Sequence, residues 1–122
     1  MANEISAICN LTASKGGVSL PGVSKTKQVT MTGTDMYAAT ASITTTTSTL
    51  SFGSITGAPE FTRITNIDPT NFVYLSMQTP ASTNPFAKLK PGYSTLVPLV
   101  SATVYALADT ATCQLFVEAV ET

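Results

Sequence analysis

Short segments in which apolar and polar residues alternate follow one another along the chain. A period of two is typical of β-strands with one buried face. The first segment places Ile5, Ala7, Cys9 and Leu11 on one face. Further strand-like segments lie at 26–32, 61–67, 72–77, 93–100, 103–108 and 112–121. With one or two more strands in 36–52, the pattern predicts about eight short strands and no helix.

Turn-forming residues separate these segments. In Asp68-Pro69-Thr70-Asn71, aspartate accepts backbone hydrogen bonds and proline presets the next φ; Lys90-Pro91-Gly92 suits a type II turn. Leu20-Pro21-Gly22 is likewise expected to be a turn. Pro98 cannot donate to a ladder, so the strand around it should be an edge strand or carry a bulge. The chain is therefore predicted to be all-β, a single antiparallel β-sandwich or jelly roll over residues 1–122.

Two segments stand out as candidate contact surfaces. Residues 1–20 are a candidate extended assembly arm. Residues 37–52 include four consecutive threonines, Thr44 to Thr47, and predict polar strands with weak register at an exposed edge or against another subunit. The candidate interface residues are Ile5, Ile8, Leu11, Leu20, Tyr37, Ile43, Leu50, Phe52 and Tyr93.

The chain is poor in charge. Charged residues make up 11% of the 122 residues and the net charge is −1, whereas threonine and serine supply about a quarter, which indicates strands with a neutral, polar outer face. The basic residues are scattered, and the pairs Lys25/Lys27 and Lys88/Lys90 suit solvated strand edges better than phosphate sites. We therefore expect no nucleic-acid partner. A surface poor in charge suits contact with protein, because few ions must be desolvated.

The cellular compartment in which the protein is made can be predicted from membrane-spanning and signal segments. No apolar stretch approaches about 20 residues, so no membrane span is expected. The start, Met1 to Ile5, lacks a basic region followed by an apolar core. Synthesis in a cytoplasm is therefore expected. Cys9 and Cys113 should then be reduced, buried thiols, with a disulfide between the first and last strands as the alternative.

The sequence offers little catalytic chemistry. It contains no histidine, which removes the commonest general base and zinc ligand. Asp35, Asp68 and Asp109 adjoin or occupy turns and are expected to serve the backbone. No calcium-binding or phosphate-cradling loop is visible. We therefore expect no enzyme, catalytic residue, metal site or cofactor; a hydrolase would need two carboxylates in one cleft.

The second half of the chain resembles a known class of protein. The segments 65–73 (TNIDPTNFV), 86–92 (FAKLKPG), 98–99 (PL) and 104–111 (VYALADTA) resemble small virion structural proteins of tailed bacteriophages, in which such turns punctuate a compact β-sandwich. The resemblance covers about half of the chain. It implies a capsid decoration (cement) protein that stabilises the capsid lattice.

The resemblance also implies partners and a location. The protein would be a homo-oligomer, with a trimer favoured, bound to the major capsid protein or another virion protein. It would be made in the host bacterial cytoplasm and end in the virion. The alternative is a fibre, an adaptor, or a receptor- or carbohydrate-binding β-module. For that alternative, Tyr37, Tyr74, Tyr93 and Tyr105 are candidates to stack on sugar rings, although core or interface positions suit them better without tryptophan.

Overall fold

The secondary structure of the described residues consists of short antiparallel strands. The computed structural model describes residues 5–22, 24–31, 34–55 and 57–121. Within them lie twelve strands, more than the eight expected: β1 (Ile5–Cys9), β2 (Ser14–Lys15), β3 (Val18–Ser19), β4 (Lys25–Val29), β5 (Met36–Ile43), β6 (Ser48–Thr49), β7 (Phe61–Asn66), β8 (Val73–Ser76), β9 (Ala87–Leu89), β10 (Ser94–Val97), β11 (Tyr105–Ala108) and β12 (Cys113–Val120).

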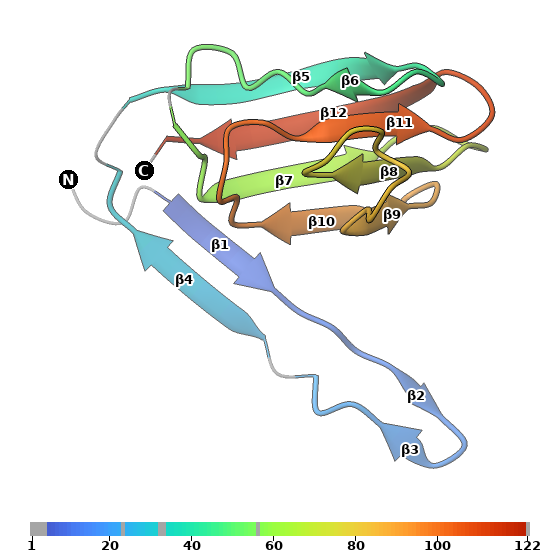
Figure 1. The fold of residues 1–122 in the computed structure, drawn as a ribbon. Helices are drawn as coiled ribbons and strands as arrows, with labels where there is room; N and C mark the ends of the chain where they lie inside the picture. The colour runs from blue at the N-terminus through green and yellow to red at the C-terminus, as the bar shows by residue number, and fades with distance from the viewer. Residues whose placement is uncertain (1–4, 23, 32–33, 56, 122) are drawn as a thin grey trace.

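Two four-stranded sheets pack face to face and form the body of the molecule (Figure 1). We call β10-β7-β12-β5 the long sheet and β6-β11-β8-β9 the short sheet. This confirms the predicted β-sandwich. The remaining four strands, β1 to β4, form two small two-stranded ladders outside the sandwich. The additional strands are β2 and β3 of this N-terminal segment and the short strands β6 and β9 of the short sheet.

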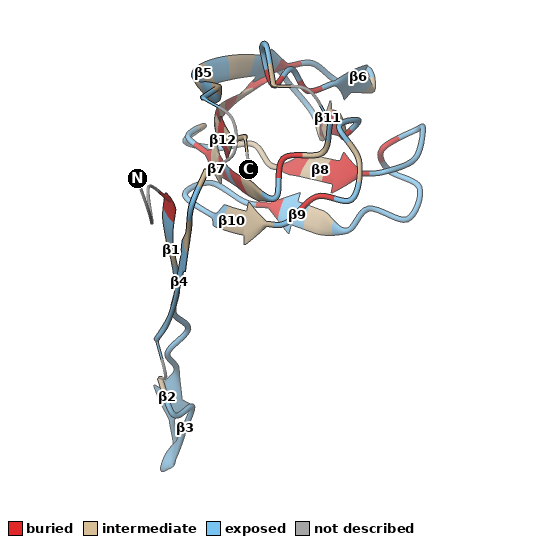
Figure 2. Ribbon diagram, turned by 90° about the vertical axis from the view of Figure 1, so that its left-hand side faces the viewer, coloured by how far each residue is buried: buried red, intermediate tan, exposed pale blue. Residues whose placement is uncertain are grey.

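The last strand, β12, organises the long sheet. It pairs with β5 over eight residues and with β7 over six. Its alternating side chains Cys113, Leu115, Val117 and Ala119 are all buried, as the pattern predicts. They meet buried residues of the short sheet, and Figure 2 shows this red interior between the two layers. The short-sheet side of the core includes Val73, Leu75, Val104, Ala106 and Ala108.

The turns that begin at Asp68 and Lys90 form as their sequences predict. The carboxylate of Asp68 accepts hydrogen bonds from the backbone N–H of Asn71 (2.8 Å) and Thr70 (3.0 Å), and these bonds hold the pKa of Asp68 below its usual value. The N–H of Tyr93 donates to the carbonyl of Lys90 (2.9 Å), with Gly92 at φ 81°. Strand β10 lies at a sheet edge and ends one residue before Pro98, which confirms the edge position.

A buried amide joins the two sheets at one end of the sandwich. Asn66 closes β7 of the long sheet, and its Nδ2 donates to the carbonyl of Leu89 in β9 of the short sheet (2.8 Å) and to that of Asn71 (2.9 Å). Its Oδ1 accepts from the N–H of Asp68 (2.9 Å) and from Sγ of Cys113 (3.3 Å). Every polar atom of this fully buried side chain is therefore satisfied.

Asn66→Ala should lower the free energy of unfolding by about 3 kcal/mol, because it leaves buried carbonyls and a buried N–H without partners. Urea unfolding followed by circular dichroism measures the change. The control is Thr65→Ala, the neighbouring residue whose side chain faces outward; we expect it to stay within about 0.5 kcal/mol of the parent protein. Equal stability of the two variants would contradict the role given to the amide.

Candidate functional site

The N-terminal strands form one long hairpin that projects from the body past the β10 edge (Figures 1 and 2). Strands β1 and β4 pair over five residues, from Ile5 opposite Val29 to Cys9 opposite Lys25. Farther out, Lys15 pairs with Val18 across Gly16 and Gly17. Both glycines have positive φ, 59° and 82°, as a two-residue type I′ hairpin requires. We call residues 5–29 the arm and residues 10–22 its tip.

In the arm, the chain does not reverse at the expected turn. The chain reverses at Gly16–Gly17, and Leu20-Pro21-Gly22 instead interrupts the returning side of the hairpin between β3 and β4. Proline supplies no N–H to a ladder and Gly22 has φ 67°, so the two residues break the pairing without reversing the chain. The Gly-Gly pair is the sequence signal for this hairpin, because two glycines between strand-like segments suit a two-residue loop.

The tip presents one apolar face to solvent. The N–H of Leu20 donates to the carbonyl of Ala13 (2.8 Å), so Leu20 lies opposite Ala13 as Val18 lies opposite Lys15. Paired residues share a face, and so do residues two apart on one strand. Leu11, Val18 and Leu20 therefore gather on one side together with Ala13 and Lys15, and the three large apolar side chains have 73%, 74% and 47% of their surfaces exposed.

At the base of the arm, β1 lies over the outer face of the long sheet. A cleft of about 480 Å³ separates them, lined by Ile5, Ser6, Ala7, Ile8, Met36, Tyr37, Ala38, Phe61, Arg63, Leu96, Glu118, Ala119 and Val120. Ile5 is buried at this contact, whereas Ile8, three residues farther along β1, is exposed. The base of the arm is therefore anchored to its own subunit and the tip is not.

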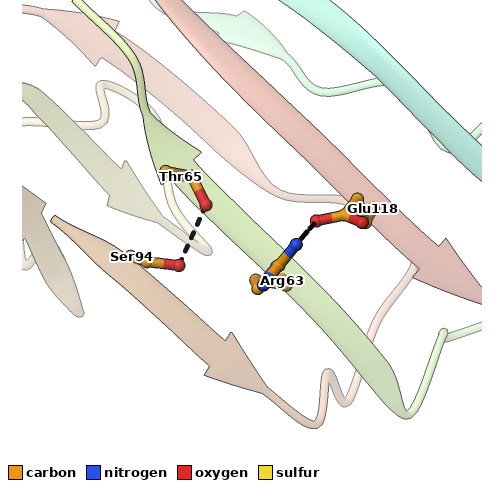
Figure 3. Close-up of polar contacts among 4 residues, drawn as sticks. All are labelled: Arg63, Thr65, Ser94 and Glu118. Atoms are coloured by element: carbon orange, nitrogen blue, oxygen red, sulfur yellow. Dashed lines mark hydrogen bonds and ion pairs between the residues drawn. The ribbon is translucent and has the colours of Figure 1, made fainter. Parts of the chain in front are cut away.

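The floor of the cleft carries one ion pair (Figure 3). Arg63 of β7 lies directly opposite Glu118 of β12, and its Nε donates to Glu118 Oε1 (2.6 Å). One row away, the hydroxyls of Thr65 and Ser94 are 2.9 Å apart and link β7 to β10 (Figure 3). The arginine side chain is more than half exposed, so the pair adds little to stability and mainly fixes the outward row of side chains.

The predicted interface residues separate into two groups. Ile8, Leu11, Leu20 and Tyr93 are exposed. Ile43, Leu50 and Phe52 belong to the hydrophobic core, and Tyr37 packs against it. Ile5 is buried at the base of the arm. The segment around Leu50 turns inward because its N–H donates to the carbonyl of Val104 (2.8 Å). Strand β5 does lie at a sheet edge. Residues 1–4 of the expected arm lie outside the described part of the chain.

The carboxylates of Asp68, Asp109 and Glu121 accept backbone hydrogen bonds, and that of Glu118 pairs with Arg63. Asp109 accepts from the N–H of Phe72 (3.3 Å), which confirms a turn role like that of Asp68. The carboxylate of Glu121 accepts from the N–H of Asp35 (3.2 Å) at the start of β5. Among the described residues, no group of three or more potential metal ligands is found and no helix is long and apolar enough to cross a membrane.

The cysteines differ in their surroundings. Both are free thiols; Cys113 is buried in the body, as expected, but Cys9 is exposed on the arm, so the expected burial of Cys9 is wrong. Burial, with added repulsion from the charges of Asp68 and Asp109, raises the pKa of Cys113 to about 11. Cys113 therefore remains a protonated donor to Asn66.

The four tyrosines lie in different places. Tyr74 stacks edge-on against Phe72, with ring centroids 5.2 Å apart. Tyr37 packs toward the core and Tyr93 follows a turn. Tyr105 lines an open hollow of about 650 Å³ with the hydroxyl residues Thr45 to Thr49, and with Thr79, Pro80 and Leu107. The sequence did not bring these hydroxyls and Tyr105 together, because β6 and β11 are distant along the chain.

No family model, no curated protein and no solved structure matches this chain.

In the folded protein, a maleimide at pH 7.5 should label Cys9 alone, because Cys113 is buried and its pKa is about 11. Intact mass should show one label in buffer and two in urea. The Cys9→Ser variant should take none in buffer. A second label on the folded protein would show that Cys113 is accessible.

Proposed function

We propose that this protein is a structural subunit of a bacteriophage virion, of the capsid decoration (cement) class. It works by assembling as a homo-oligomer on the major capsid protein or another virion protein. The observation that carries the proposal is the apolar face of the tip, formed by Leu11, Val18 and Leu20. A face of this kind on a projecting hairpin is typical of a surface that a partner protein covers.

Two further features support this function. The segments at 65–73, 86–92 and 104–111 carry the resemblance to small virion proteins. The body has few charges and its strands carry hydroxyls, so a partner can cover it without stripping water from many ions. Most soluble homo-oligomers are closed and symmetric, and the proposed oligomer is of this kind.

Replacing the apolar face tests the assembly role. The triple variant Leu11→Ser, Val18→Ser, Leu20→Ser should shift the protein from oligomer to monomer in analytical ultracentrifugation, with its far-UV circular dichroism spectrum unchanged because these side chains are exposed in the single subunit. Val100→Ser is the control, since Val100 is 89% exposed and lies outside the arm. A parent protein that is monomeric at high concentration would overturn the proposal.

The virion location has its own test. Particles of the encoding phage, purified on a density gradient, should contain this chain at a fixed ratio to the major capsid protein, measured by quantitative mass spectrometry. The triple-serine variant should be depleted from such particles. Absence of the parent chain from intact particles would contradict a virion role even if the purified protein forms oligomers.

A receptor- or carbohydrate-binding module is the second candidate, and the hollow at Tyr105 favours it. Hydroxyls beside an aromatic ring suit a sugar, whose ring stacks and whose hydroxyls form hydrogen bonds. On a glycan array, binding should be lost in Tyr105→Ala and kept in Tyr93→Ala, because Tyr93 lies outside the hollow. Absence of any signal from the parent protein would count against this candidate.

A further inference from the structure

The edges of the two sheets are unequally protected against pairing with another strand. Unpaired N–H and C=O groups at an edge accept a further strand unless the edge is short, charged or interrupted by proline. Strand β6 has two residues, β9 has three including Lys88, and β10 has four and is followed by Pro98. In contrast, β5 has eight residues, with no charge and no proline. Its edge is the accessible one.

The backbone groups on the free side of β5 can be assigned. The N–H of Glu121 donates to the carbonyl of Asp35 (2.9 Å). Because hydrogen-bonded and non-bonded pairs alternate in an antiparallel ladder, Tyr37, Ala39 and Ala41 bond to β12. The N–H and C=O groups of Met36, Ala38, Thr40 and Ser42 then point away from it. No described backbone hydrogen bond outside the β5–β12 ladder involves these four residues.

The tip of the arm has a matching edge. Ala13 is hydrogen-bonded to Leu20, so the alternation leaves the backbone groups of Thr12 and Ser14 pointing outward. This outgoing side of the hairpin contains no proline, whereas the returning side contains Pro21. The outgoing side therefore has the complete row of donors that strand addition needs.

The charges of the arm and of the rest of the chain indicate which strand is added at the β5 edge. The arm contains Lys15, Lys25 and Lys27 and no acidic residue, a net charge of +3. Residues 30–122 have a net charge of −3, from the bases Arg63, Lys88 and Lys90 and the acids Asp35, Glu60, Asp68, Asp109, Glu118 and Glu121. Within one subunit the arm leaves beside β10, at the opposite edge of the long sheet from β5 (Figure 1). A second copy must supply the tip.

We infer that the tip of one copy adds to the β5 edge of a second copy and extends its long sheet. An antiparallel pairing must oppose the outward groups of Thr12 and Ser14 to those of the even-numbered residues of β5. Among these registers, the one with Ser14 opposite Met36 and Thr12 opposite Ala38 brings Lys15 opposite Asp35. This inference deepens the proposed assembly function by naming the partner and the two surfaces.

This register also covers the apolar face. Leu11 comes opposite Ala39, on the face of the long sheet that points into the sandwich, and Val18 and Leu20 share that side. Tyr37 and Ile55 are partly buried against the core there. The apolar face of the tip thus continues the core layer of the neighbouring subunit. Because the donor and acceptor surfaces differ, repeated contacts form a ring where the rotation between neighbouring copies closes, and an open filament where it does not.

Disulfide trapping tests the pairing. In a Cys9→Ser background, Thr12→Cys on one copy and Ala38→Cys on another should cross-link under mild oxidation, since directly opposite residues lie about 5.5 Å apart at Cα. The product should have twice the 12.7 kDa mass of the chain. The matched control is Ser94→Cys in place of Ala38→Cys, an exposed position on the opposite edge of the same sheet, and it should give no such product.

A single chain that carries both Thr12→Cys and Ala38→Cys should form covalent multimers whose largest member reports the ring size, with a trimer expected. If the parent protein is oligomeric yet Ala38→Cys cross-links no better than Ser94→Cys, the pairing is overturned and the assembly function stands. If the parent protein is monomeric at high concentration, both are overturned.

A charge exchange tests the register. Lys15→Asp or Asp35→Lys alone should weaken self-association by about fivefold, and the double variant should recover it, because an exposed ion pair is restored. Sedimentation equilibrium measures the change, and melting temperatures confirm that each variant is folded. Failure of the double variant to recover association, beside two weakened single variants, would exclude Lys15 opposite Asp35.

Discussion

The buried amide of Asn66 is the interaction on which the sandwich depends. A β-sandwich needs its sheets held in one relative position, and apolar packing alone tolerates small shifts, whereas a buried hydrogen-bond network does not. Asn66 reaches from the end of β7 to the carbonyl of Leu89 in the opposite sheet. The same side chain fixes the turn that begins at Asp68 and accepts from Cys113. The body is therefore rigid at the end where its turns meet.

This rigidity explains how one chain contains both a compact body and a projecting arm. In β12 the apolar residues face a second sheet that is held over them, so they are buried. In the arm the same alternation lies beyond the edge of the body, where no second sheet covers it. Among the described apolar residues of the arm, Ile5 at the base is the one that is buried. The arm thus exposes apolar side chains because of its place in the topology.

Local chemistry made much of the fold predictable and long-range topology did not. The turns at Asp68 and Lys90, the edge position of β10 and the buried face of β12 follow from neighbouring residues alone. The role of Asn66 requires knowing that β7 and β9 end together. The sequence predicts contact residues at Ile43, Leu50 and Phe52 because they lie in a polar segment. In the structure the chain passes there from the long sheet to the short sheet, and the three side chains are part of the core. The exposure of the arm likewise depends on which strands it fails to meet.

Unequal edge protection would give the proposed assembly a direction. If every edge were open, any strand of one copy would pair with any edge of another, and the result would be aggregation. Here short length, lysine or proline blocks β6, β9 and β10. The arm with its three lysines is drawn to a body with an excess of acids, and the bodies repel one another. Body-to-body stacking is thereby disfavoured and arm-to-body contact favoured. A low total charge is compatible with this selectivity because the two signs are segregated along the chain.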